Sequence, residues 1–109
     1  MQGGVPPLSE SASLETFAQA GAQADQASGT PHGHFVSAAN TGNASAENEI
    51  LRQSKSLGTF QQVMLLGVQS FVAEGVNGTH YRNLLGNYSQ LGCGGVISGS
   101  QITVVWDFQ

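Results

Sequence analysis

Apolar residues first recur at helical spacing in residues 11–25, so this segment is predicted to form a helix with one buried side. Ser11 or Ser13 can cap its start, and the helix is expected to run to about Asp25. Its apolar positions are Leu14, Phe17, Ala18 and Ala22. The abundant alanine also favours helix.

A second helix is predicted from Thr59 to Glu74. Thr59 with Gln62 forms a capping-box pattern, and Gly75 is a suitable left-handed stop. Its broad apolar stripe consists of Phe60, Val63, Met64, Gly67, Val68, Phe71 and Val72, widened by Leu65 and Leu66. We therefore expect this helix to be buried on more than one side.

The end of the chain changes to a period of two, which indicates strands. Residues 95–98 and 102–108 are β-like, and Gly99-Ser100 between them is a hairpin signal. In the second strand the alternation predicts one face with Ile102, Val104, Trp106 and Phe108 and another with Thr103, Val105 and Asp107.

The remaining segments are more polar. Residues 1–10 read as an extended lead-in to a single domain formed by residues 11–109. Residues 28–46 read as a loop, and residues 47–54 as a short helix. Helices followed by a terminal hairpin predict an α+β layered domain.

Composition limits the classes of function. Only 9% of residues are charged and the net charge is −4, with three cations in Arg52, Lys55 and Arg82. Scattered cations exclude nucleic acid and anionic membrane surfaces as expected partners. No stretch approaches the ~18 apolar residues of a membrane span. Cys93 is alone, so we expect a small packed side chain rather than a disulfide or a reactive thiol.

Few side chains remain for polar chemistry, and they fall into three clusters. His32 and His34 lie in the predicted loop, and Glu47 and Glu49 follow it. Glu74 ends the second helix, where a carboxylate opposes the helix dipole. It therefore needs a partner, and His80 across the following turn is the nearest candidate. Imidazoles with carboxylates are suitable ligands for zinc or another divalent cation, although the spacing alone matches no metal motif.

Six motifs in order resemble the CAP superfamily of cysteine-rich secretory, antigen 5 and pathogenesis-related 1 proteins, in particular its small bacterial members with an SCP-like extracellular domain. They are Pro7-Leu8 with Leu14-x-x-Phe17-Ala18, Ala46-Glu47-Asn48, Phe71-x-x-Glu74, Gly78-Thr79-His80-Tyr81, Tyr88-x-x-Leu91-Gly92-Cys93-Gly94 and Trp106-x-Phe108. Ala46 and Phe71 replace a glycine and a tryptophan of the family pattern, and Thr79 is an insertion. The disulfides of eukaryotic members are absent.

The resemblance implies a three-layer α-β-α sandwich with a central antiparallel sheet. It also implies a cavity that presents Glu47, Glu74, His80 and either His32 or His34, with His32 slightly favoured. In such a site His80 and one loop histidine would hold zinc or another divalent cation, and the glutamates would orient them or a bound water.

Three functions follow from the resemblance. The first is a secreted, extracellular or periplasmic binding module, monomeric and with its signal peptide removed, which takes a small apolar ligand such as a lipid or an extracellular protein. The second is a metal-dependent, peptidase-like hydrolase in which Glu47 or Glu74 would be catalytic by activating a metal-bound water. The third is a structural or interaction domain with no ligand.

Overall fold

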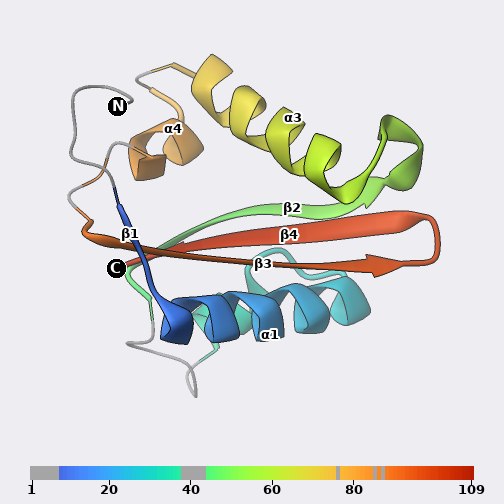
Figure 1. The fold of residues 1–109 in the computed structure, drawn as a ribbon, viewed down its shortest axis with the longest axis horizontal. Coiled ribbons are helices and arrows are strands. Elements are labelled where there is room, and N and C mark those ends of the chain that lie inside the picture. The colour runs from blue at the N-terminus through green and yellow to red at the C-terminus, as the bar shows by residue number, and fades with distance from the viewer. Residues whose placement is uncertain (1–7, 38–43, 76, 85, 87) are drawn as a thin grey trace.

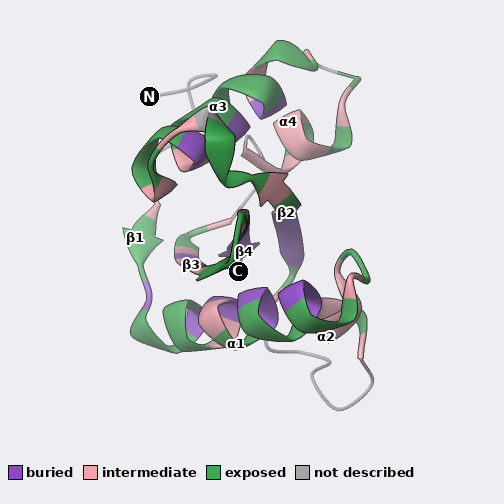
Figure 2. Ribbon diagram, turned by 90° about the vertical axis from the view of Figure 1, so that its right-hand side faces the viewer, coloured by how far each residue is buried: buried purple, intermediate pink, exposed green. Residues whose placement is uncertain are grey.

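The chain folds into three layers, with a four-stranded sheet between two layers of helices (Figures 1 and 2). This computed structural model describes residues 8–37, 44–75, 77–84, 86 and 88–109. The helices are α1 (Ala12–Ser28), α2 (Gly33–Val36), the 3-10 turn η3 (Lys55–Leu57), α3 (Phe60–Ala73) and α4 (Thr79–Leu84). The strands are β1 (Ser9–Glu10), β2 (Ala46–Ser54), β3 (Gln90–Ser98) and β4 (Gln101–Phe108). The predicted α-β-α sandwich is confirmed.

The sheet has the order β1-β3-β4-β2, and β2 forms one edge. Strands β3, β4 and β2 are antiparallel, as predicted, whereas the two-residue β1 pairs in parallel with β3. Strand β1 lies in the predicted lead-in, whose first seven residues are outside the described part of the chain. Part of the predicted loop, residues 38–43, is outside it as well.

The local signals at the helix ends are confirmed. Ser11 caps α1 by accepting a hydrogen bond from the Leu14 backbone, and the helix continues past the expected end to Ser28, with Gly29 in the left-handed region. Both hydrogen bonds of the capping box at the start of α3 are present. Gly99 has a φ of 58° in the β3–β4 turn, which confirms the hairpin.

The predicted short helix at residues 47–54 is wrong, because the segment is strand β2. It pairs with β4 from Ala46 opposite Phe108 to Ser54 opposite Gln101, with an irregularity after Ile50. The ladder pairs one side of the β2 backbone with β4 and places alternate side chains on opposite faces. Tertiary pairing therefore overrides the local preference of a polar segment.

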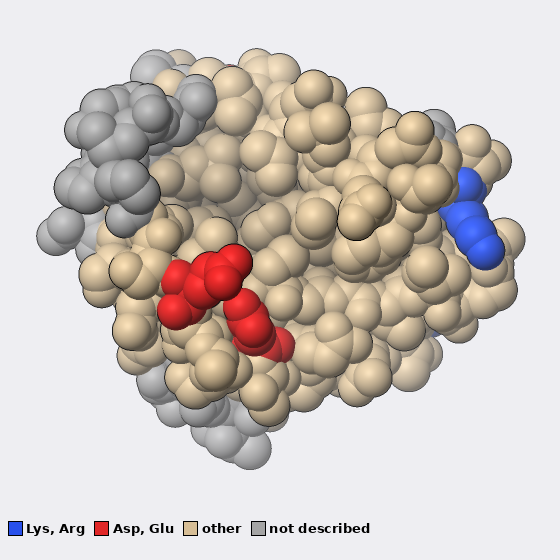
Figure 3. Space-filling view, in the orientation of Figure 1, with Lys and Arg blue, Asp and Glu red and all other residues tan. Residues whose placement is uncertain are grey.

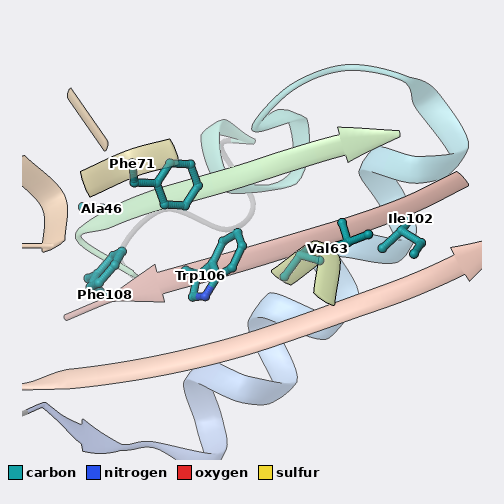
Figure 4. Packing of buried hydrophobic residues seen from close by; sticks show 7 residues of the cluster. Ala46, Val63, Phe71, Ile102, Trp106 and Phe108 are labelled. Carbon is teal, nitrogen blue, oxygen red and sulfur yellow. The ribbon is translucent and has the colours of Figure 1, made fainter. Parts of the chain in front are cut away.

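The two faces of β4 pack against different helices. As predicted, Ile102, Val104, Trp106 and Phe108 share one face, and their core includes Val63 and Phe71 of α3 (Figure 4). The other face places Val105 against Ala18 and Ala22 of α1. Small side chains on this side allow α1 to approach the sheet closely.

Two side chains fix α1 to the edges of the sheet. Arg52 of β2 has a φ of 52° and donates to the carbonyl oxygens of Gln26 (3.0 and 2.8 Å) and Ala27 (3.2 Å), which lie at the C-terminal end of α1. On the opposite edge, Gln19 bonds both backbone groups of Gly95 in β3, accepting at 2.9 Å and donating at 2.8 Å. Arg52 thereby holds the segment that follows α1 beside β2.

Candidate functional site

The first two residues of the candidate site, His32 and Glu47, form a hydrogen-bonded pair. Nδ1 of His32 lies 2.7 Å from Oε2 of Glu47, and the His32 backbone donates to Oε1 of Glu49 at 2.7 Å. His32 has a φ of 56°, a conformation that a non-glycine residue adopts at a cost. The two carboxylates stabilise it there. The imidazole is one-third exposed whereas the Glu47 side chain is buried, so the pair extends from the surface inward.

The second pair, Glu74 and His80, lies in the turn between α3 and α4. Oε2 of Glu74 is 2.7 Å from Nδ1 of His80, and Oε1 accepts a hydrogen bond from the His80 backbone at 3.1 Å. The prediction that Glu74 pairs with His80 is confirmed. The His80 ring holds the pKa of Glu74 below its usual range. The same ring stacks on Phe71 with centroids 4.7 Å apart, which fixes its orientation.

Strand β2 separates these pairs. Glu47 lies opposite Asp107 in β4, on the face that α1 covers, and Glu49 shares this face by alternation. Asn48 points to the other face, where it donates to the His80 carbonyl at 3.1 Å and accepts from Asn83 at 2.8 Å. Since β2 is an edge strand, the pairs flank that edge from opposite sides.

His34 has surroundings different from those of His32. Its backbone donates to Oδ1 of Asp25 at 3.0 Å, and its ring packs on Phe17 with centroids 4.7 Å apart. The structure thus places His32 beside Glu47 and places His34 against α1. Whether either residue binds a metal stays a prediction.

Three carboxyl groups near the site, Glu49, Asp25 and Asp107, were absent from the cavity that the family resemblance implied, although Glu49 was among the clustered polar residues. Burial raises the pKa of Glu49 to about 9, and the adjacent Asp25 adds to this effect. Burial also raises the pKa of Asp107 to about 9, aided by Glu47, whose own pKa burial raises to about 7. Alternation would have placed Glu49 beside Glu47 once residues 47–54 were treated as a strand.

The donor set fits a divalent cation. Within the described residues, His32, Glu47 and Glu49 each offer a ligand atom within 4.8 Å of the others. Oε1 of Glu47 and Oε2 of Glu49 are buried and accept no hydrogen bond from any residue that the structure describes. A bound cation would supply the positively charged partner that these oxygens lack.

The remaining features of the described residues do not add reactive groups to this site. Cys93 is half-buried with its sulfur 3.7 Å from that of Met64, and burial raises the pKa of its thiol to about 11, which disfavours a nucleophilic thiolate. Figure 3 shows a face with few charged side chains, as the composition predicts. Among the described helices, none has the length and apolar character needed to cross a membrane.

Comparison with known proteins supplies the family. A model of the "Cysteine-rich secretory protein family", CAP, matches residues 2–108. No curated protein and no solved structure matches the chain. The match covers nearly every residue, including both His/Glu pairs and the Gly92-Cys93-Gly94 segment. The chain therefore belongs to the CAP family of cysteine-rich secretory proteins.

Proposed function

We propose that residues 11–109 form an extracellular CAP-type binding module, monomeric, that holds a divalent cation through His32, Glu47 and Glu49. The observation that supports this proposal is the convergence of one imidazole and two carboxylates within 4.8 Å. His32 is partly exposed and Glu47 is buried, so a cation can enter past the imidazole and reach the carboxylates. Family membership supports the extracellular location, since CAP domains are generally extracellular.

Zinc or manganese is expected to raise the melting temperature of metal-free protein, because a ligand that binds only the folded state stabilises it. At 100 times Kd the gain is about 2.7 kcal/mol. His32→Ala and Glu47→Gln should abolish the shift in a thermal scan with and without metal. His34→Ala is the matched control and should retain it. No shift in the wild type would contradict the proposal.

The expectation that His80 shares the cation stays a prediction, because His80 and Glu74 flank β2 from the other side. His80→Ala in the same scan tests it: loss of the shift supports a two-histidine site, and a retained shift assigns the cation to His32 and its carboxylates. The hydrolase alternative, with Glu47 or Glu74 activating a metal-bound water, also stays a prediction. Cleavage of a peptide library by metal-loaded protein would support it.

A groove between β2 and α3 favours a small apolar ligand as a second function. Its cavity of about 190 Å³ is lined by Ile50, Gln53, Val63, Leu66, Gly67 and Ser70. This volume lies below the roughly 300 Å³ of the smallest typical ligand pockets, so we propose a short acyl chain rather than a sterol. An extracellular protein is the other partner class that the family suggests.

Titration with octanoate is expected to change the fluorescence of Trp106 until the signal saturates. Cholesterol is expected to cause no such change. Trp106 is the single tryptophan, and a Cβ built on Gly67 would lie 3.2 Å from its ring, so the indole senses the groove. Leu66→Asp should abolish the octanoate response, because Leu66 lines the cavity. Leu65→Asp is the matched control at a neighbouring exposed leucine outside the lining. Equal responses in both variants would count against the groove.

A further inference from the structure

Four of the chain's seven acidic residues converge on the α1 side of the sheet. They are Asp25 from α1, Glu47 and Glu49 from β2, and Asp107 from β4. Asp107 is fully buried and lies opposite Glu47 in the strand register. Asp25 is 1% exposed and lies beside Glu49, so each β2 carboxylate has a second carboxyl group adjacent to it.

Five oxygen atoms of this cluster are buried without a hydrogen-bond donor among the described residues. They are Oδ2 of Asp25, Oε1 of Glu47, Oε2 of Glu49 and both carboxyl oxygens of Asp107. Asp25 satisfies only its other oxygen, through the His34 backbone. Asp107 is the strongest anomaly, because its fully buried side chain faces Glu47 and neither of its oxygens meets a donor among the described residues.

Buried carboxyl groups in contact require compensation, because like charges repel and unpaired oxygens lose their hydration. Protons shared between facing groups offer one form of compensation. Two shared protons, however, leave two of the four carboxyl groups charged and one of the five oxygens without a partner. A divalent cation neutralises two charges and attracts several oxygens at once, which matches the two negative charges that remain.

We infer that Asp25 and Asp107 form the inner wall of the proposed cation site and make it a site for a hard, oxygen-preferring divalent cation of the Mn²⁺ and Ca²⁺ class. This inference rests on the proposed function. Zinc draws its affinity mainly from nitrogen and sulfur ligands, and this site offers one imidazole. The inner wall adds negative charge behind Glu47 and Glu49, and removal of such groups typically lowers metal affinity 10–100-fold.

The test uses metal-free full chain titrated with Mn²⁺, with free Mn²⁺ followed by electron paramagnetic resonance and with Ca²⁺ and Zn²⁺ as competitors. Asp107→Asn and Asp25→Asn are each expected to weaken Mn²⁺ and Ca²⁺ binding 10–100-fold and zinc binding less. Glu10→Gln, which makes the same chemical change at an exposed carboxyl, should leave all three affinities unchanged. Circular dichroism of each metal-free variant checks folding, and the amide that Asp107→Asn introduces can donate a hydrogen bond to Glu47.

The outcomes separate this inference from the proposed function. If both inner-wall variants bind Mn²⁺ and Ca²⁺ as the wild type does, while His32→Ala or Glu47→Gln abolishes binding, the inference is overturned and the proposed function stands. If both variants lose zinc and Mn²⁺ affinity equally, the preference for hard cations is overturned. If no cation binds the wild type, the proposed function itself fails.

Discussion

Raising the pH of metal-free protein from 5 to 9 is expected to lower its melting temperature steadily. Burial raises the folded-state pKa of Asp107 and Glu49 to about 9 and that of Glu47 to about 7, from ordinary values of 3.8 for Asp107 and 4.5 for the glutamates. Between the two values the folded protein binds more protons than the unfolded chain. The stability that these three groups contribute is therefore fully present below about pH 4, and it is lost as the pH rises through their folded-state pKa values.

The size of this effect distinguishes it from ordinary surface titration. Even ~1 kcal/mol of net cost would lower the melting temperature of a domain near this size by roughly 4–8 °C. Glu74 acts in the opposite direction, because its pKa is lowered, but its pair is solvent-exposed and screened. The titratable groups that face one another in this cluster are Asp25, His32, Glu47, Glu49 and Asp107. The fall of the melting temperature with pH is therefore expected to arise from them.

Scanning calorimetry at several pH values in the presence of a chelator measures this trend. Asp107→Asn should reduce its slope, because the substituted side chain cannot ionise while Glu49 still can, and Glu10→Gln should reproduce the wild-type slope. A melting temperature that is constant or rises from pH 5 to 9 would show that the four carboxyl groups are not held together as described.

Gly92→Ala and Gly94→Ala are expected to destabilise the fold by ~2–3 kcal/mol or more each, or to prevent folding. Both glycines lie in β3 directly beneath α1. A Cβ on Gly94 would meet the backbone of Ala18 at 2.6 Å and overlap that of Gln19, and a Cβ on Gly92 would overlap the backbone of Leu14 and Glu15. Backbone atoms cannot rotate away as a side chain can, so the helix must shift.

Urea denaturation gives the free energy of unfolding for these variants. Gly99→Asn is the control: no atom lies within 4 Å of its Cβ position, and asparagine tolerates a φ of 58°. It should change stability by much less than either β3 variant. Wild-type stability in Gly92→Ala or Gly94→Ala would mean that α1 does not lie this close to the sheet. The close approach gives a physical reason for glycine at both positions of Gly92-Cys93-Gly94.

The sequence predicted those elements whose signals are local. The caps at Ser11 and Thr59 and the turn at Gly99 depend on neighbouring residues alone, and all were confirmed. The pairing of Glu74 with His80 was also predictable, because a carboxylate at a helix C-terminus requires a partner. Each of these signals spans only a few residues of the chain.

Strand β2 and most of the acidic cluster could not be predicted in this way. Asn48 contacts α4 and its neighbours Glu47 and Glu49 face α1, so polar residues occupy both faces of the strand after Ala46 and no clear apolar alternation appears. Asp107 had been placed on the correct face of its strand, but its burial follows only from the position of α1 across that face. Asp25 was assigned to the end of a helix. These residues meet through packing between layers, which no short window of sequence contains.

The hydrogen bonds between Gln19 and Gly95 have a consequence for aggregation. From Gly92 onward, the outer edge of β3 has no neighbouring strand among the described residues, and such edges invite pairing with other molecules. Proteins often protect an edge with lysine, and this chain has a single one. Here the edge is protected by the side-chain amide of Gln19, which belongs to α1 and occupies the backbone groups of Gly95 as a neighbouring strand would. Detachment of α1 would therefore expose an aggregation-prone strand edge at the same time as it exposes the core.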